Sequence, residues 1–309
     1  MSSTSDEFPP YRHRVYGLTI ATWIPFPELE SAPADAPVDA VFRLGEVPAE
    51  LASPQFTGTC FQAAPDELLM WVTEGARYWV RDGREIIVQT KSDAPLDAVR
   101  ILLLCWPLGA LLLQRKLLPL HASVIATTRG AVAFLGASRA GKSTLAAHFC
   151  RTGFRVLSDD VAVVQFAPDG RPWIAPGYPQ FKLWPEVAEK LGEDASRMPN
   201  LWPSQPKRSL SFQSEFHSTS LPVARLYVLE PVATDEVHLS LLTPFESIRC
   251  LAEHTYRAQF VPGLGLQGSH FQSIARLADA VPLTRVRRPA QGFQLERLTT
   301  VLAADFGTA

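Results

Sequence analysis

The residues from Gly136 to Thr144 read GASRAGKST and fit the pattern G-x-x-x-x-G-K-[ST]. Glycines let such a loop curl until its main-chain amides point inward, and a following helix adds positive partial charge, so the loop attracts phosphate. At this spacing Lys142 is expected to bridge the β- and γ-phosphates of ATP, and Ser143 to offer its hydroxyl to Mg²⁺. The alternative is a glycine turn before a surface helix, with a solvated lysine. The predicted phosphate-binding residues are Gly136, Ala137, Ser138, Arg139, Ala140, Gly141, Lys142, Ser143 and Thr144.

Two adjacent acids, Asp159 and Asp160, close the apolar stretch FRVLS that follows the loop and its helix. Neighbouring residues of a regular strand face opposite sides, so both carboxylates reach one site only if the strand ends or bends there. Phosphoryl transfer needs a metal ligand and a proton acceptor. We expect Asp160, with Ser143, to hold the metal and Asp159 to take the proton from an attacking hydroxyl. A surface turn with two acids is the alternative.

Several basic and aromatic residues could complete a site, although each has an ordinary structural explanation. Lys207 and Arg208 could swing onto the triphosphate or onto an acidic acceptor, because cations neutralise the charge of the transferred group. A solvated loop pair is equally expected. His121, taken alone, is more readily a packed or surface histidine. The other candidates, for a pocket or for a solvated face, are His254, Tyr256, Arg257, Arg285, Arg287, Arg288, Trp173, Trp184 and Trp202.

The order of apolar runs and amphipathic segments over residues 118–309 predicts an α/β domain around these groups. The apolar run AVAFLG leads into the loop, STLAAHFCRTG has helical texture, and FRVLSDDVAVVQF reads as the return strand, parallel to the first. Asp169 and Gly170 predict a hairpin turn, and about 192–220 predicts a long polar loop. RLYVLEP and VHLSLL predict further strands. The segments FESIRCLAEHTY, HFQSIARLADA and FQLERLTTVLAA have the amphipathic spacing of helices.

The first part of the chain predicts a different organisation. Short period-two alternations over 1–94 indicate a small β-rich module of antiparallel strands, with a turn at Asp82 and Gly83. An apolar helix over 95–117 then links it to the catalytic domain, 118–309. The longest apolar run, from Ile101 to Leu113, is shorter than the roughly 20 residues of a membrane span.

Composition excludes several classes of protein. The chain has 309 residues, 47% of them hydrophobic and 19% charged, with a net charge of −2, so a strongly basic surface for nucleic acid is not expected. The four cysteines are widely spaced and read as reduced thiols. The start MSSTSDEFPP lacks the pattern of a signal peptide. We therefore expect a cytoplasmic protein without a membrane or nucleic-acid partner.

The segment LPLHASVIATTRGAVAFLGASRAGKSTLAAHFCRTGFRVLSDDVAVV resembles the catalytic domain of HPr serine kinase/phosphorylase. It is more similar to the HPr-kinase-related proteins of ribosomal-peptide gene clusters, which include lasso-peptide precursor kinases. The likeness covers about 118–166, and a looser one extends through PGYPQFKLWPE, PKRSL and HTYR. It implies a P-loop domain akin to phosphoenolpyruvate carboxykinase, which transfers a nucleotide phosphate to a protein serine.

On this resemblance the loop glycines, Lys142, Ser143 and Thr144 match the phosphate loop, and Asp159 and Asp160 match the aspartate pair. His121 matches a histidine near the transferring phosphate. The sequence departs from the family after the aspartates, where HPr kinases carry a segment like E-I-R-G-x-G. Here Lys182 or Trp184 stands about where the family has an acid, and Glu186 is the nearest replacement. This departure argues against HPr as substrate and against the reverse reaction.

The sequence therefore predicts an ATP- and Mg²⁺-dependent kinase acting on a hydroxyl, preferentially serine, of a peptide or small protein. A lasso-peptide precursor is one such acceptor. Two alternatives stay open: a kinase of a small-molecule hydroxyl, and a nucleotide-binding adaptor that performs no chemistry. An oligomer is compatible with the resemblance, because HPr kinases form hexamers.

Overall fold

The computed structural model describes residues 9–72, 76–90, 96–202, 205–291 and 295–307. Within them the chain forms a mixed α/β structure with several sheets, arranged as two compact units. Unit 1 comprises Met1–Lys116 together with Gln259–Leu266, and unit 2 comprises Leu117–Ala258 with Gln267–Ala309. Parts of the predicted N-terminal module (1–8, 73–75, 91–94), of the linking helix (95) and of the polar loop (203–204), and the side chain of Trp202, lie outside the described residues.

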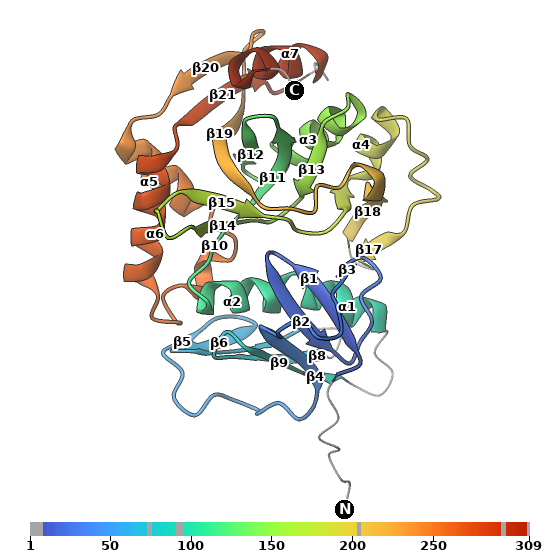
Figure 1. Cartoon of the computed structure of the whole chain (residues 1–309), viewed down its shortest axis with the longest axis vertical. Helices are drawn as coiled ribbons and strands as arrows, with labels where there is room; N and C mark the ends of the chain where they lie inside the picture. Colours follow the sequence, from blue (N-terminus) through green and yellow to red (C-terminus); the bar gives the residue numbers. More distant parts are fainter. Residues whose placement is uncertain (1–8, 73–75, 91–95, 203–204, 292–294, 308–309) are drawn as a thin grey trace, which may run out of the picture. The chain divides into compact units, whose positions relative to one another are not determined.

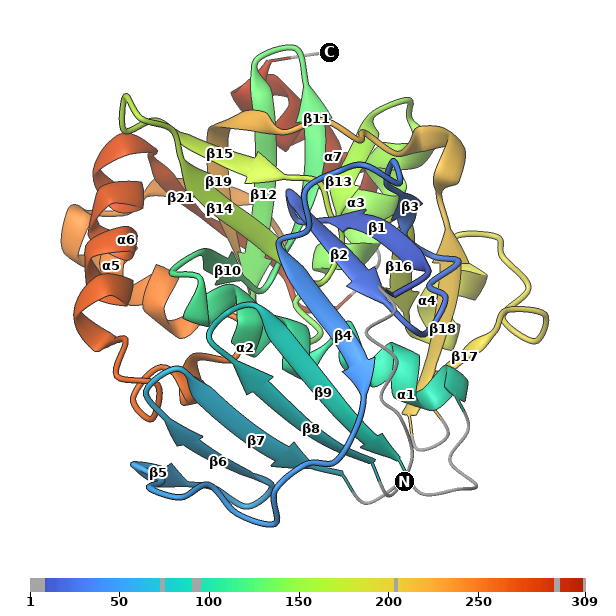
Figure 2. The same cartoon turned by 60° about the horizontal axis from the view of Figure 1, so that its bottom comes forward.

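Unit 1 is built on a sheet with the order β3-β1-β2-β4-β9-β8-β7-β6-β5. The prediction of antiparallel strands throughout was wrong, because β4 runs parallel to both of its neighbours, β2 and β9. Asp82 and Gly83, both with positive φ, form the predicted turn between β8 and β9. Figure 2 shows the sheet with α2 lying over it. The strands are β1 (Tyr11–Val15), β2 (Leu18–Thr22), β3 (Glu30–Ser31), β4 (Ala40–Leu44), β5 (Phe56–Thr57), β6 (Phe61–Ala64), β7 (Glu67–Trp71), β8 (Ala76–Arg81) and β9 (Glu85–Thr90).

The predicted single helix over 95–117 is instead two helices, α1 (Leu96–Leu103) and α2 (Trp106–Gln114). The break falls just before Pro107, which has no N–H to donate and therefore occupies the first turn of a new helix. The Gln114 side chain accepts from Gly83 N–H and donates to the Val80 carbonyl, so α2 is fixed to the sheet.

Within the described residues, the helical stretch Leu96–Gln114 is long and apolar enough to cross a membrane, judged by length and composition alone. It exceeds the thirteen-residue run from Ile101 to Leu113 that the sequence suggested. The stretch is 61% buried inside the protein, as in core helices that pass the same test. It is weak evidence for a span, and the absence of a membrane partner stays a prediction.

The main sheet of unit 2 has the order β10-β14-β15-β19-β12-β11-β13, with β21 paired to β19 and β20 to β21 (Figure 1). β12, β19 and β21 are parallel neighbours, while β11 is antiparallel to both β12 and β13. The strand after the loop helix, β13, therefore runs in the direction of β12, as predicted. The strands are β10 (Leu118–Leu120), β11 (Ala122–Thr127), β12 (Gly130–Gly136), β13 (Arg155–Ser158), β14 (Ala162–Phe166), β15 (Pro172–Ala175), β19 (Leu221–Val232), β20 (His238–Leu241) and β21 (Leu283–Pro289).

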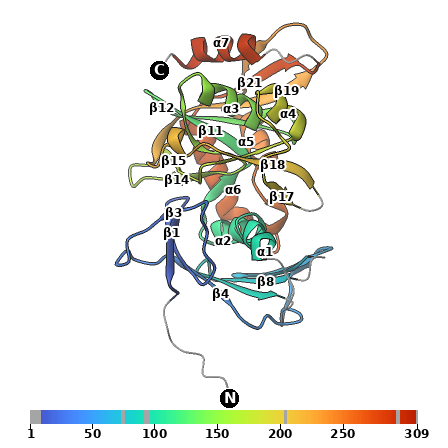
Figure 3. The ribbon, with the colours of Figure 1, turned by 90° about the vertical axis from the view of Figure 1, so that its right-hand side faces the viewer.

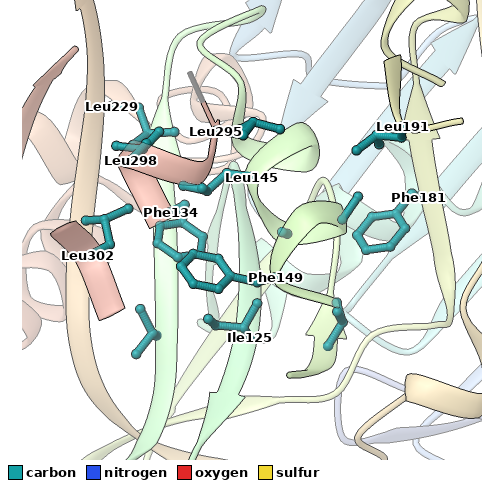
Figure 4. Packing of buried hydrophobic residues seen from close by; sticks show 14 of the residues in the cluster. Ile125, Phe134, Leu145, Phe149, Phe181, Leu191, Leu229, Leu295, Leu298 and Leu302 are labelled. Carbon is teal, nitrogen blue, oxygen red and sulfur yellow. The ribbon is translucent and has the colours of Figure 1, made fainter. Parts of the chain in front are cut away.

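Helices cover both faces of this sheet. Phe134 of β12 points to the side of α3 (Lys142–Arg151) and α7 (Leu295–Phe306), where its ring stacks on Phe149 with centroids 5.7 Å apart (Figure 4). The neighbouring Leu135 points to the other side, with α5 (Pro244–Glu253) and α6 (Gln267–Ala280). Figure 3 shows α7 beside α3. The three predicted C-terminal helices are thereby confirmed.

Two predictions about local structure were wrong. FRVLSDDVAVVQF is not one strand: β13 ends at Ser158 and β14 begins at Ala162, because Asp160 has a left-handed φ of 73° and the Ser158 hydroxyl closes the turn onto the Val161 carbonyl. Aspartate tolerates this conformation better than most residues. The polar loop 192–220 contains a hairpin of β17 (Asn200–Trp202) and β18 (Gln205–Ser211), and β18 also pairs with β16 (Gln180–Leu183), which precedes α4 (Pro185–Lys190).

Candidate functional site

The predicted phosphate loop lies between β12 and α3, so the strand–loop–helix order that the motif requires is present. Gly136 and Gly141 have φ values of 144° and 98°, which favour glycine. A Cβ at Gly136 would stand 2.8 Å from the Leu229 carbonyl oxygen, so only glycine fits. Ala137, Ser138 and Arg139 are exposed at the crest, and Ala140 is buried beneath it. The loop therefore curls tightly around a space, the phosphate cradle, and a side chain at Gly136 would disturb it.

The Lys142 side chain turns back into this cradle. Its ammonium donates to the Gly136 carbonyl at 2.8 Å and to the Ala137 carbonyl at 3.1 Å, and the residue is only 6% exposed. Burial lowers the pKa of Lys142 to about 8, although Asp159 and Asp160 act in the opposite direction. A buried cation with two neutral partners is stabilised by an arriving anion, as expected for a phosphate site.

Asp159 lies at the carboxyl end of β13 and is 3% exposed. Ser123 Oγ donates to its Oδ1 at 2.6 Å, and the Lys182 main-chain N–H donates to its Oδ2 at 3.1 Å. Ser143 lies close enough to this carboxyl for its hydroxyl to favour the ionised form. Burial nevertheless raises the pKa of Asp159 above its usual value. The phosphate loop and the acid pair therefore meet at Ser143 and Asp159, whereas the sequence-based expectation paired Ser143 with Asp160.

Asp160 faces different partners, with 17% of its side chain exposed. Lys182 Nζ lies 2.9 Å from its Oδ2, and His121 Nδ1 lies 3.4 Å from its Oδ1. Burial alone would raise the pKa of Asp160, but the Lys182 ammonium, with His121, outweighs it and holds that pKa well below the usual range. The turn after β13 thus lets both acids face the site, one with a raised pKa and the other ionised.

His121 stands between β10 and β11, and its Nδ1 lies 2.9 Å from the Asp160 main-chain oxygen. A carbonyl oxygen only accepts, so Nδ1 carries the proton and Nε2 of the neutral ring is the acceptor. Burial, then the charge of Lys142, lowers the pKa of His121 below its usual value. The ring is therefore neutral at pH 7, and its acceptor nitrogen can take a proton.

Other predicted residues divide between the site and its surroundings. Lys207 is close enough to act electrostatically on both Lys142 and Asp160, while Arg208 follows it on β18, where neighbouring side chains face opposite ways. Two cations lie over the Trp184 ring: the Arg139 guanidinium carbon is 4.4 Å from the ring centroid, and Lys207 Nζ is 5.7 Å from it.

The C-terminal groups also separate. Arg288 donates to the Ala140 carbonyl of the loop at 2.6 and 3.2 Å. Arg285 pairs with Glu230 and Glu246 instead. His254 lies near the site: the main-chain N–H of His121 donates to the His254 carbonyl. Burial lowers the pKa of His254, and the charge of Lys142 lowers it further. Four further predicted residues are accounted for by packing or pairing. The Arg257 guanidinium lies over the Tyr256 ring, Arg287 lies beside Glu230, and Trp173 is paired into the sheet between β14 and β19.

Sequence reasoning missed Ser123 and the role of Lys182. Ser123 lies on β11, two residues after His121, which stands just before that strand, and this spacing was the available signal. Lys182 was noted only as the residue near an expected acid. Glu186, the suggested replacement for that acid, is exposed in the first turn of α4.

The donors present fit Mg²⁺ but not a metal held by protein groups alone. Ser143 and Asp159 supply a hydroxyl and a carboxylate oxygen, which suit a hard cation that completes its shell with phosphate and water. Among the described residues no group of three or more histidine, cysteine, aspartate or glutamate side chains could hold a metal ion.

Comparison with known proteins adds little. No family model matches the chain, and no curated protein matches it. One similar solved structure is the Hpr(Ser) kinase/phosphatase from Coxiella burnetii, at 9% identity over 60% of this chain and 93% of that one. The TM-score of this match is 0.31.

Proposed function

We propose that unit 2 is an ATP- and Mg²⁺-dependent phosphotransferase whose acceptor is a hydroxyl, preferentially a serine of a peptide or small protein. The observation that carries this proposal is a buried lysine at the start of the helix after a glycine loop, next to two acids of which one is bonded by Ser123 and the other by Lys182. A phosphate-binding loop alone fits any nucleotide-binding protein. The acid pair with a neutral histidine supplies what group transfer needs in addition.

The phosphate tail is proposed to lie against the main-chain amides of 136–144, with Lys142 at its terminal phosphate. Ser143 and Asp159 are the residues that would hold Mg²⁺, and the ion would neutralise charge on the phosphate oxygens. Asp159 is proposed for this role because it is the acid beside Ser143, and Ser123 and a main-chain N–H hold its two oxygens in place. We therefore propose that Asp159 takes the metal-binding role that the sequence-based expectation gave to Asp160, and that the proton goes to a residue outside the acid pair.

The proton is proposed to pass to His121. As the acceptor oxygen bonds to the γ-phosphorus, its proton moves to Nε2, and the bond from that phosphorus to the bridging oxygen breaks with its electron pair left on the β-phosphate. The imidazolium that forms is stabilised by the ionised Asp160 beside Nδ1. Lys182 keeps Asp160 ionised and in place.

The class of acceptor is supported by the sequence resemblance alone, including the suggestion of a lasso-peptide precursor. A small-molecule hydroxyl remains the second candidate for the same chemistry. An adaptor without chemistry is disfavoured, because nucleotide sensing requires no proton acceptor.

The test is incubation with γ-labelled ATP, Mg²⁺ and the peptides encoded beside the gene, with mass spectrometry for an added phosphate. Lys142→Ala and Asp159→Asn are expected to abolish transfer while keeping the fold, and Glu186→Gln, at an exposed position, serves as the control. Near-normal transfer by either of the first two variants would refute the assignment. Nucleotide binding with no labelled acceptor would favour the adaptor.

A further inference from the structure

Strand β20 (His238–Leu241) forms one edge of the main sheet of unit 2. It pairs with β21 on one side, and among the described residues no strand pairs with its other side (Figure 1). Edge strands are usually protected from further pairing by charged side chains, by proline or by a bulge. β20 reads HLSL and its register with β21 is regular, so it contains no lysine, arginine, acid, proline or bulge. The strand is therefore open to pairing with another strand.

The register shows which main-chain groups of β20 face this open edge. Just after the strand, the Leu242 N–H donates to the Leu283 carbonyl of β21 at 2.9 Å. Hydrogen-bonded residues alternate along an antiparallel pair, so Ser240 also bonds to β21, while the main-chain groups of Leu239 and Leu241 point away from it. The open edge therefore presents the N–H and carbonyl groups of two leucines, one on either side of Ser240.

Apolar side chains are exposed at the same place. Leu241, the last residue of β20, is 68% exposed, and Phe245, four residues later in the first turn of α5, is 75% exposed. Leu239 shares a face of the strand with Leu241 and is half-buried against the core under α7. Unpaired main-chain groups and exposed apolar side chains together are typical of a surface that another strand covers.

We propose that this edge pairs with the same edge of a second copy of the chain, antiparallel, about a two-fold axis through Ser240. The stretch Leu239–Leu241 reads the same in both directions, so Leu239 faces the partner's Leu241, and each such pair exchanges two main-chain hydrogen bonds. The strand holds no lysine, arginine or acid that would meet its like across the axis. A two-fold interface requires this self-complementarity, whereas an unrelated peptide strand does not. The main sheets of the two copies then join into one.

The first test is the mass of the full chain by sedimentation equilibrium at about 1 µM and about 100 µM. The contact is small, so we expect a dissociation constant on the order of 10 µM, with mostly monomer at the lower concentration and mostly dimer at the higher. Leu241→Lys places like charges side by side, and Leu241→Pro removes an N–H that points to the open edge, so both should stay monomeric at the higher concentration. Phe271→Lys, at a 58% exposed position on α6, is the control and should dimerise as wild type does.

A cysteine at position 240 reports the register of the pairing. Ser240 and the partner's Ser240 would form a non-hydrogen-bonded pair with Cα atoms about 4.5 Å apart, a separation that a disulfide spans. Ser240→Cys should therefore give a covalent dimer under mild oxidation. His238→Cys, also exposed but two residues from the axis, should give no more than the background of the wild-type cysteines.

Thermal unfolding identifies a variant that has lost its fold, and the remaining variants then decide. Wild-type protein that stays monomeric at about 100 µM, or a folded Leu241→Lys that dimerises as wild type does, would overturn the proposal. Loss of the dimer in Phe271→Lys to the same extent, or equal cross-linking of the two cysteine variants, would also overturn it, because the copies would then meet elsewhere. The pairing and its test do not depend on phosphotransferase activity.

Discussion

The pKa of Lys142 makes nucleotide affinity depend on pH in a defined direction. In the free protein burial lowers this pKa to about 8, from an ordinary value of 10.5. Bound phosphate keeps the ammonium charged, so above about pH 8 binding must be accompanied by uptake of one proton, and affinity falls up to about tenfold for each pH unit. Between about pH 7.5 and 9.5 the expected loss is about 25-fold, or about 2 kcal/mol.

Titration calorimetry with ATP and Mg²⁺ measures this loss, and buffers of different ionisation enthalpy report the proton directly. Lys142→Arg is the matched control, because a guanidinium stays charged throughout this range and should give a nearly flat profile. The phosphate tail itself does not ionise further there. Equal slopes for wild type and Lys142→Arg would refute the assignment of Lys142 as the buried cation that meets the phosphates.

Three further predictions concern the residues around the loop. Lys182→Met leaves Asp160 buried without its cation, so unfolding in denaturant should show a loss of about 3 kcal/mol. Lys116→Met, at an exposed position, should change stability by less than about 0.5 kcal/mol, and equal losses would contradict the pairing of Lys182 with Asp160. Gly136→Ala should weaken tripolyphosphate binding at least about tenfold, because its Cβ would meet the Leu229 carbonyl, while Gly268→Ala, in open space, should leave binding unchanged. His121→Gln should lower kcat about 100-fold or more with KM for ATP unchanged, and an effect on KM alone would speak against proton transfer.

The phosphate loop could be predicted because its chemistry is local. The glycines, Lys142 and Ser143 are fixed by spacing along the chain, and the flanking apolar runs identify strand and helix. The amphipathic helices near the C-terminus were predicted for the same reason. The hairpin of β17 and β18 was missed because β17 has only three residues and β18 reads QPKRSLS, which is almost wholly polar.

The partners of the acids could not be predicted in this way. Lys182 reaches Asp160 only because β16 enters beside the turn after β13. Nothing in the sequence indicates that Asp160 rather than Asp159 takes the left-handed conformation of that turn. Pairing of Ser143 with Asp159 rather than Asp160 depends on that turn. The roles of the two acids therefore follow from backbone conformation, which residue types alone leave open.

Unit 1 has consequences for biosynthesis, because its parts are separated along the chain. Phe260, wholly buried, meets the ring of Phe61 with centroids 4.9 Å apart, although nearly two hundred residues separate them. A ribosome must translate most of the message before this unit has all its parts. A fragment that begins at Leu117 would carry Phe260 and Leu264, which belong to unit 1, without their apolar neighbours. Such a fragment is expected to expose these side chains and to aggregate rather than to fold as an independent domain.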